Sequence, residues 1–126
     1  MTNKTIISTD AAPKAIGPYS QAIKVGSLLI ISGQIPLNVQ GEVVGCNIVT
    51  QTHQALTNLK AIIEAAGMTL ANTAKCTCFL KNMNDFTAFN TVYTEYFSTS
   101  LPARECVEVA RLPKDTLVEI SAICAE

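Results

Sequence analysis

Short apolar runs dominate the first third of the chain and are typical of strands. They cover residues 4–8, 21–25 and 28–32. Gly26-Ser27 separates the second run from the third, which predicts a hairpin. The continuous apolarity of residues 28–31 predicts a strand that is covered on both faces. Between the first two runs, prolines and a glycine in residues 9–18 predict a surface loop.

The apolar period then changes to that of helices. Apolar residues between Ile48 and Ala66 recur at i, i+3, i+4 and i+7, which predicts a helix of about five turns. Asn47 is its predicted N-cap, and Gly67 follows its end. A second helix is predicted from a cap at Asn84 to about Phe97. We interpret its aromatic stripe as core; the stripe comprises Phe86, Phe89, Tyr93, Tyr96 and Phe97.

Three further alternating runs predict strands at residues 74–80, 104–110 and 117–125. A turn at residues 112–115 would join the last two as a hairpin. Alternation sends one face of this hairpin to the core, namely Val107, Val109, Val118, Ile120 and Ala122. The other face would carry Arg104, Cys106, Glu108, Leu117, Glu119, Ser121 and Ile123. The order of elements predicts a single α+β domain over residues 1–126, with two helices on one face of a mixed sheet.

Charge is sparse in this chain. Only 15% of its 126 residues are charged, against about 25% in an average soluble domain, and the net charge is -1. Such a balance disfavours general nucleic-acid binding. The low charge suggests a homo-oligomer that hides apolar surface. Five cysteines without a repeated spacing, and no secretory or membrane-spanning run, predict a cytoplasmic protein with reduced thiols.

Two charged residues near the end of the chain are the candidates for chemistry. Arg104 offers a rigid fork of donors that matches a carboxylate, or it forms an ordinary surface ion pair with Glu119 or Glu108. Glu119 could hold or deprotonate a water molecule if its pKa is raised, or it is a solvated strand residue. Gly17-Pro18-Tyr19-Ser20 is a rigid turn that presents a tyrosine hydroxyl.

Other residue types point less clearly to chemistry. The single histidine, His53, would need a thiol such as Cys106 beside it to form a nucleophilic pair. Cys76 and Cys78 lack a second ligand pair, so we interpret them as buried thiols and predict no metal site. The chain has neither a glycine-rich phosphate loop nor a dinucleotide fingerprint.

Three separated motifs resemble the RidA/YjgF family of reactive-intermediate deaminases over nearly the whole chain. They are residues 15–22 (AIGPYSQA), 32–36 (SGQIP) and 102–115 (PARECVEVARLPKD). The resemblance implies a chorismate-mutase-like α+β sandwich with a six-stranded sheet, assembled as a homotrimer with ligand clefts between subunits. It also implies hydrolysis of 2-imino acids or their enamine tautomers, such as 2-iminopropanoate and 2-iminobutanoate, to 2-keto acids and ammonia, without a cofactor.

The resemblance assigns roles to individual residues. Arg104 would grip the substrate carboxylate, with help from the backbone N–H of Cys106, and Glu119 would place the attacking water. The cleft would be completed by Tyr19, Ser32, Gly33 and Asn90, some of them from a neighbouring subunit. Two alternatives stay open: a regulatory protein that binds 2-keto acids without turnover, and a ribonuclease or translation inhibitor.

Overall fold

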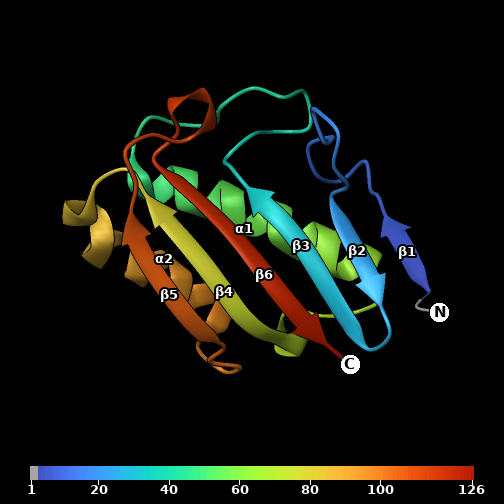
Figure 1. The fold of residues 1–126 in the computed structure, drawn as a ribbon. Coiled ribbons are helices and arrows are strands. Elements are labelled where there is room, and N and C mark those ends of the chain that lie inside the picture. The colour runs from blue at the N-terminus through green and yellow to red at the C-terminus, as the bar shows by residue number, and fades with distance from the viewer. Residues whose placement is uncertain (1–2) are drawn as a thin grey trace.

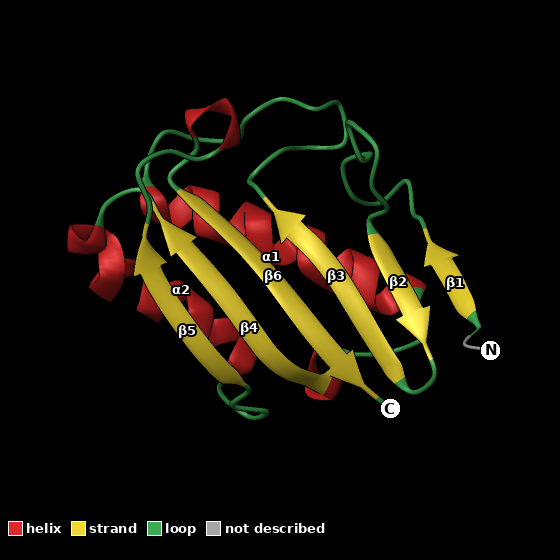
Figure 2. Ribbon diagram, viewed as in Figure 1, coloured by secondary structure: helices red, strands yellow, loops and turns green. Residues whose placement is uncertain are grey.

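A computed structural model describes residues 3–126 as one six-stranded sheet with two helices on one of its faces (Figures 1 and 2). The strands are β1 (Lys4–Ile7), β2 (Ala22–Val25), β3 (Leu28–Gln34), β4 (Thr73–Leu80), β5 (Ala103–Glu108) and β6 (Val118–Ala125). The helices are α1 (Ile48–Ala65) and α2 (Phe86–Phe97). Short 3₁₀ turns lie at Leu70–Asn72, Met83–Asp85 and Pro113–Asp115. The mixed sheet with two helices confirms the predicted fold class.

Helix α1 begins and ends where the sequence predicts. The Asn47 side chain accepts a hydrogen bond from the Thr50 N–H at 2.9 Å, which satisfies one of the free donors at the helix start. Gly67 follows the end of the helix with φ +81°, a conformation that costs glycine little. The helix packs Leu56, Leu59 and Ile62 fully buried against the sheet. Neither helix of residues 3–126 is long and apolar enough to span a bilayer.

The start of α2 differs from the prediction. Asn84 lies inside the 3₁₀ turn Met83–Asp85 and does not cap the helix. The side chain of Asn82 instead accepts a hydrogen bond from the Asn84 N–H at 2.9 Å, so this cap belongs to the turn before the helix. The aromatic interpretation is confirmed for Phe89, Tyr93 and Phe97, all of which are buried.

Strands β5 and β6 do not form the predicted hairpin. The sheet order is β1-β2-β3-β6-β4-β5, so β4 lies between them (Figure 1). β4 pairs parallel with β5 and antiparallel with β6. Because α2 connects β4 to β5, these two strands form a crossover unit, and the turn after β5 must carry the chain past β4 before β6 begins. Two alternating runs joined by a short turn therefore predicted the wrong neighbour.

The new pairing also changes the predicted face of β5. Arg104 and Cys106 are register partners of the buried residues Cys76 and Cys78, so both lie on the helix side of the sheet. Val107, predicted to be core, lies on the open side and is 45% exposed. For β6 the prediction is confirmed, since Val118, Ile120 and Ala122 are buried under the helices. The sequence-based assignment of Arg104 and Glu119 to one face was wrong.

The side of the sheet away from the helices is apolar and open in the single chain. Leu28 and Ile30, predicted to be covered on both faces, are 41% and 46% exposed there. Other exposed apolar side chains on this face are Ile6, Val107 and Ile123. We call this surface the open face. Nothing in residues 3–126 covers it, so the double coverage predicted for β3 does not occur within one chain.

Candidate functional site

Arg104 lies near the start of β5, where α2 passes over the sheet. Its Nη1 donates a hydrogen bond to the Asn90 side-chain oxygen at 2.7 Å. The guanidinium lies 4.7 Å from the centroid of the Tyr93 ring, and the rings of Phe86 and Phe89 are within 6 Å. These rings orient the cation through its favourable interaction with aromatic faces. Within residues 3–126, no carboxylate forms an ion pair with it.

An open hollow of about 510 Å³ lies against Arg104. Its wall includes Asn90, Tyr93, Thr94, Pro102 and the arginine itself. Cys106 follows two residues later on the same face and is half-buried. Burial raises the pKa of its thiol, and the nearby Arg104 lowers it by a smaller amount. The thiol therefore stays protonated at neutral pH, and the dominant feature here is a half-buried cation that lacks a carboxylate partner.

Glu119 lies at the start of β6 and lines a second hollow of about 300 Å³. Its other lining residues are Tyr19, Ser32, Gly33, Ile35 and Pro113. Between Ile31 and Gln34 the register of β3 against β6 shifts, so Ser32 and Gly33 together face Ser121. Such a bulge bends a strand locally and re-aims its side chains. Burial raises the pKa of the Glu119 carboxyl, a useful property for a group that exchanges a proton near neutral pH.

Gly33 leaves the space that the Glu119 side chain occupies. A Cβ atom at this position would overlap Oε2 of the Glu119 side chain. We therefore expect Gly33→Ala to displace the carboxylate and to reduce any activity that depends on it. The activity of Gly33→Ala should be compared with that of Gly26→Ala, whose added Cβ meets no atom within 4 Å. Gly26 has φ +59°, so alanine there should lower the melting temperature but not the activity. Equal activity of Gly33→Ala and the wild type would contradict this role.

Two hydrogen bonds fix the loop beside Glu119. The Ser32 hydroxyl donates to the Ser20 carbonyl at 2.6 Å, which ties the bulge to the loop before β2. The Tyr19 hydroxyl accepts from the Ile16 N–H at 3.4 Å, and the tyrosine side chain is half exposed. Ser32 and Tyr19 therefore stabilise the loop that borders the hollow, and the exposed side chain of Tyr19 can also contact a ligand.

The predicted site residues fall into two groups on opposite sides of the sheet. One group holds Arg104, Asn90 and Cys106 on the helix side. The other holds Tyr19, Ser32, Gly33 and Glu119 at the open end of β3 and β6. The hollow beside Arg104 does not include Glu119, and the hollow beside Glu119 does not include Arg104. The structure of one chain thus assembles two half-sites.

Sequence reasoning missed the aromatic platform under Arg104. Phe86, Phe89 and Tyr93 were interpreted only as core, yet their rings also surround the guanidinium. Their spacing of three and four residues marks one helix face, but the sequence does not show that an arginine from β5 lies against it. Pro113, on the turn before β6, was missed as a wall of the Glu119 hollow.

His53 takes no part in either half-site. Its Nδ1 lies 3.0 Å from the Tyr96 hydroxyl, and its Nε2 lies 3.2 Å from the Glu95 carboxylate, between the two helices. Cys76 and Cys78 are fully buried, and burial raises the pKa of the Cys76 thiol to about 11. Residues 3–126 contain no group of three histidine, cysteine or acidic side chains that could hold a metal ion. The geometry gives no support to a cysteine–histidine nucleophile.

Comparison with known families shows to which family this chain belongs. A model of the family described as endoribonuclease L-PSP matches residues 9–126. The chain belongs to this family. A RutC family protein of Pyrococcus horikoshii is 58% identical over 121 residues, covering 95% of this chain and 96% of the relative.

Two further similar proteins have names that mention a substrate or a bound ligand. The 2-iminobutanoate/2-iminopropanoate deaminase of Escherichia coli is 48% identical over 120 residues, covering 93% of this chain and 94% of that protein. The crystal structure of E. coli TdcF with bound serine superposes with a TM-score of 0.92 at 44% identity, covering 97% of this chain and 98% of the other. The resemblance to the RidA/YjgF deaminases is confirmed.

Proposed function

We propose that this protein hydrolyses reactive 2-imino acids to 2-keto acids and ammonia in clefts shared between the subunits of a homotrimer. The observation that carries the proposal is the division of the candidate residues into two half-sites. Arg104 supplies a cation with no carboxylate partner among residues 3–126, and Glu119 supplies a half-buried carboxylate on the other side of the sheet. A small substrate needs both groups, and one chain cannot bring them together.

A neighbouring subunit supplies the missing half. The open face presents apolar side chains that water would otherwise contact, including Leu28, Ile30 and Ile123. Covering this face with a second chain would bury that area and remove the cost of its exposure. A closed ring of three such contacts lets each chain give Arg104 to one cleft and Glu119 to the next. The sparse charge of the sequence then reflects an interface.

The reaction needs one positioned water and one carboxylate anchor. Arg104 and the Cys106 N–H hold the substrate carboxylate, while Asn90 and the ring of Tyr93 orient the guanidinium. Glu119 accepts a proton from the water as its oxygen bonds to C2 of the imine. Glu119 passes that proton to the nitrogen of the tetrahedral adduct and takes up the hydroxyl proton as the C–N bond breaks and the C=O bond of the 2-keto acid forms. Ammonia leaves and carries this second proton away as ammonium. A protonated imine is already electrophilic, so orientation supplies much of the rate.

Mixed assemblies test the shared cleft directly. Arg104→Ala chains still carry Glu119, and Glu119→Gln chains still carry Arg104. Each pure variant should keep only a small residual activity. An equal mixture refolded together should regain full activity in about one quarter of its clefts, because random assembly pairs the two intact halves that often. The measurement is ammonia release from 2-iminopropanoate generated in situ. Absence of recovery in mixtures of confirmed trimers would contradict the shared cleft.

The family description raises ribonuclease activity as a second candidate. The geometry favours it less, because the one histidine of the sequence contacts Tyr96 and Glu95 away from both half-sites. The net charge of -1 offers little attraction to a phosphate backbone. Cleavage of single-stranded RNA that persists with a chelator and disappears in Arg104→Ala would support this candidate. A protein that binds 2-keto acids with Arg104 but releases no ammonia would instead be the regulatory alternative.

A further inference from the structure

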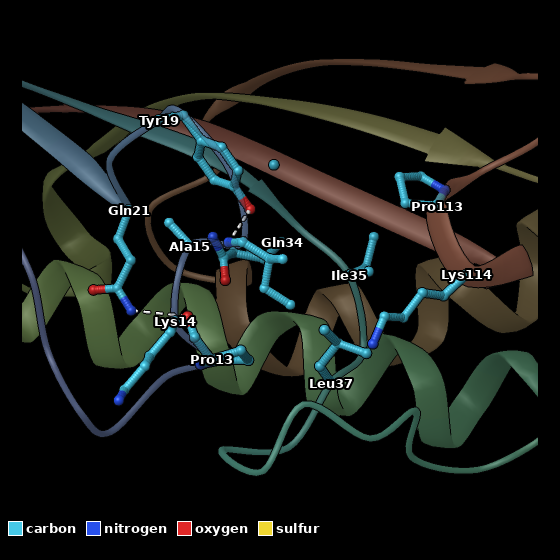
Figure 3. A pocket seen from close by; sticks show the side chains of 12 residues that line it. Pro13, Lys14, Ala15, Tyr19, Gln21, Gln34, Ile35, Leu37, Pro113 and Lys114 are labelled. Carbon is cyan, nitrogen blue, oxygen red and sulfur yellow. Dashed lines mark hydrogen bonds between the residues drawn. The ribbon is translucent and has the colours of Figure 1, made fainter.

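We infer that an apolar cavity beside Glu119 receives the side chain of the substrate, so that imino acids with bulky apolar side chains are preferred over 2-iminopropanoate. This inference rests on the proposed function. The cavity has a volume of about 230 Å³ and lies between the loop before β2 and the end of β3 (Figure 3). It shares four wall residues with the Glu119 hollow, namely Tyr19, Gly33, Ile35 and Pro113. A substrate whose C2 lies near Glu119 therefore has this space within reach of its side chain.

The size of the cavity fits more than a methyl group. An apolar protein cavity of about 150 Å³ is large enough to bind benzene. The volume of about 230 Å³ thus accommodates an isobutyl, thioether or phenyl group. The single methyl of 2-iminopropanoate would leave most of this space without contacts.

The lining favours an apolar occupant. Pro13, Ala15, Ile35, Leu37 and Pro113 present carbon atoms to the cavity (Figure 3). These carbon atoms can contact an apolar side chain that leaves water, so each added methylene favours binding.

Two glutamines of the lining hydrogen-bond within the protein. The buried Gln21 amide accepts from the Thr9 N–H at 2.7 Å and donates to the Pro13 carbonyl at 2.9 Å. Gln34 Nε2 donates to the Ser32 carbonyl at 3.0 Å. The Gln21 amide and the Gln34 amide nitrogen therefore do not need a polar group on the ligand as a hydrogen-bond partner.

Two lysines border the cavity, and one of them already donates to a backbone carbonyl. The ammonium of Lys114 donates to the Gly41 carbonyl at 3.0 Å, and its stem passes Ile35 toward Leu37 (Figure 3). The Lys14 side chain is exposed and points away from Tyr19 (Figure 3). A side chain with a terminal carboxylate would have to enter an apolar space to reach either charge, so we do not expect acidic imino acids to be preferred.

The test compares two imino acids in the full-length protein and in a variant with a filled cavity. Imines of alanine and leucine are generated in situ by an amino-acid oxidase, and ammonia release is measured above the uncatalysed rate. The wild type should show a kcat/KM about tenfold or more higher for the leucine imine, as expected for three additional buried carbons. Ala15→Phe should lower kcat/KM for the leucine imine about tenfold more than it lowers kcat/KM for the alanine imine, and so remove the preference.

The matched control is Ala71→Phe, the same substitution at an exposed alanine in the 3₁₀ turn at the other end of the sheet. It should retain the preference. Melting temperature and solution mass verify that both variants fold and assemble. Calorimetric binding of 4-methyl-2-oxopentanoate against pyruvate gives a second measurement that does not need turnover, and Ala15→Phe should weaken only the larger ligand.

The outcomes separate this inference from the proposed function. If the wild type releases no ammonia from either imine, the proposed function fails. If it hydrolyses both and the ratio of kcat/KM is unchanged in Ala15→Phe, or if both rates fall equally, the inference about the cavity is wrong while the deaminase proposal stands. A higher rate with the imine of glutamate than with that of leucine would also overturn it.

Discussion

Arg104→Ala is expected to reduce kcat/KM for 2-imino acids by roughly 100- to 1,000-fold, the usual cost of removing one partner of a buried, hydrogen-bonded charge pair. The arginine holds the carboxylate in both the bound substrate and the transition state, so most of the loss should appear as a higher KM. Initial rates over a range of imine concentrations measure this split. Arg104→Lys keeps the charge but not the fork, and it should recover only part of the loss.

Arg111→Ala is the matched control for this prediction. The Arg111 guanidinium is exposed and donates to both oxygens of Asp115, at 2.6 and 3.0 Å, so its charge is already paired outside the half-sites. The pairing raises the pKa of Arg111 and lowers that of Asp115. Removal of an exposed ion pair should leave activity within about twofold of the wild type. Equal losses in Arg104→Ala and Arg111→Ala would contradict the assignment of Arg104.

Glu119→Gln should lower kcat by roughly 100- to 10,000-fold, because the amide cannot accept the proton of the attacking water. The amide has nearly the shape of the carboxyl group, so folding and assembly should be retained. Binding of a 2-keto acid should also persist, because Arg104 is intact. A Glu119→Gln protein with the turnover of the wild type would show that the carboxylate is not the base.

The pH dependence of the rate gives a separate signature of Glu119. Burial raises the pKa of this carboxyl in the folded protein. The carboxylate form is the base, so kcat/KM of the wild type should fall as the pH is lowered through this raised pKa, which lies above that of an ordinary glutamate. The residual kcat/KM of Glu119→Gln should not show this fall at low pH. Any change caused by titration of the imine itself should appear in both proteins. Identical pH profiles for the two proteins would contradict the role of Glu119.

The local sequence pattern predicted most of the secondary structure correctly but predicted the wrong neighbour for β5. The Asn47 cap, the hairpin at Gly26-Ser27 and the buried stripe of α1 follow from interactions within a few residues, and all three are confirmed. The pairing of β5 depends on β4, which lies some 30 residues earlier in the chain. A turn between two alternating runs cannot show that a third strand is inserted between them.

The difference between local and long-range interactions also explains which parts of the site could be predicted. Motif resemblance named Arg104, Glu119, Tyr19, Ser32 and Gly33 as candidates, and the structure gathers the last four around one hollow. The aromatic platform and the close approach of Gly33 to Glu119 involve segments far apart in the sequence. Such contacts arise from packing, and a single sequence has no local signal for them.

The sequence by itself determined the helices and strands, the Asn47 cap of α1, the helix-side core of β6 and the candidate chemistry, because each depends on periodicity or on residue type. Only the tertiary structure decided that β4 separates β5 from β6 and that Arg104 lies on the helix side while Glu119 lies at the open end of the sheet. Alternation shows that neighbouring side chains point to opposite faces of a strand. Which face meets the helices depends on register with a distant strand, and that register is decided by packing of the whole chain.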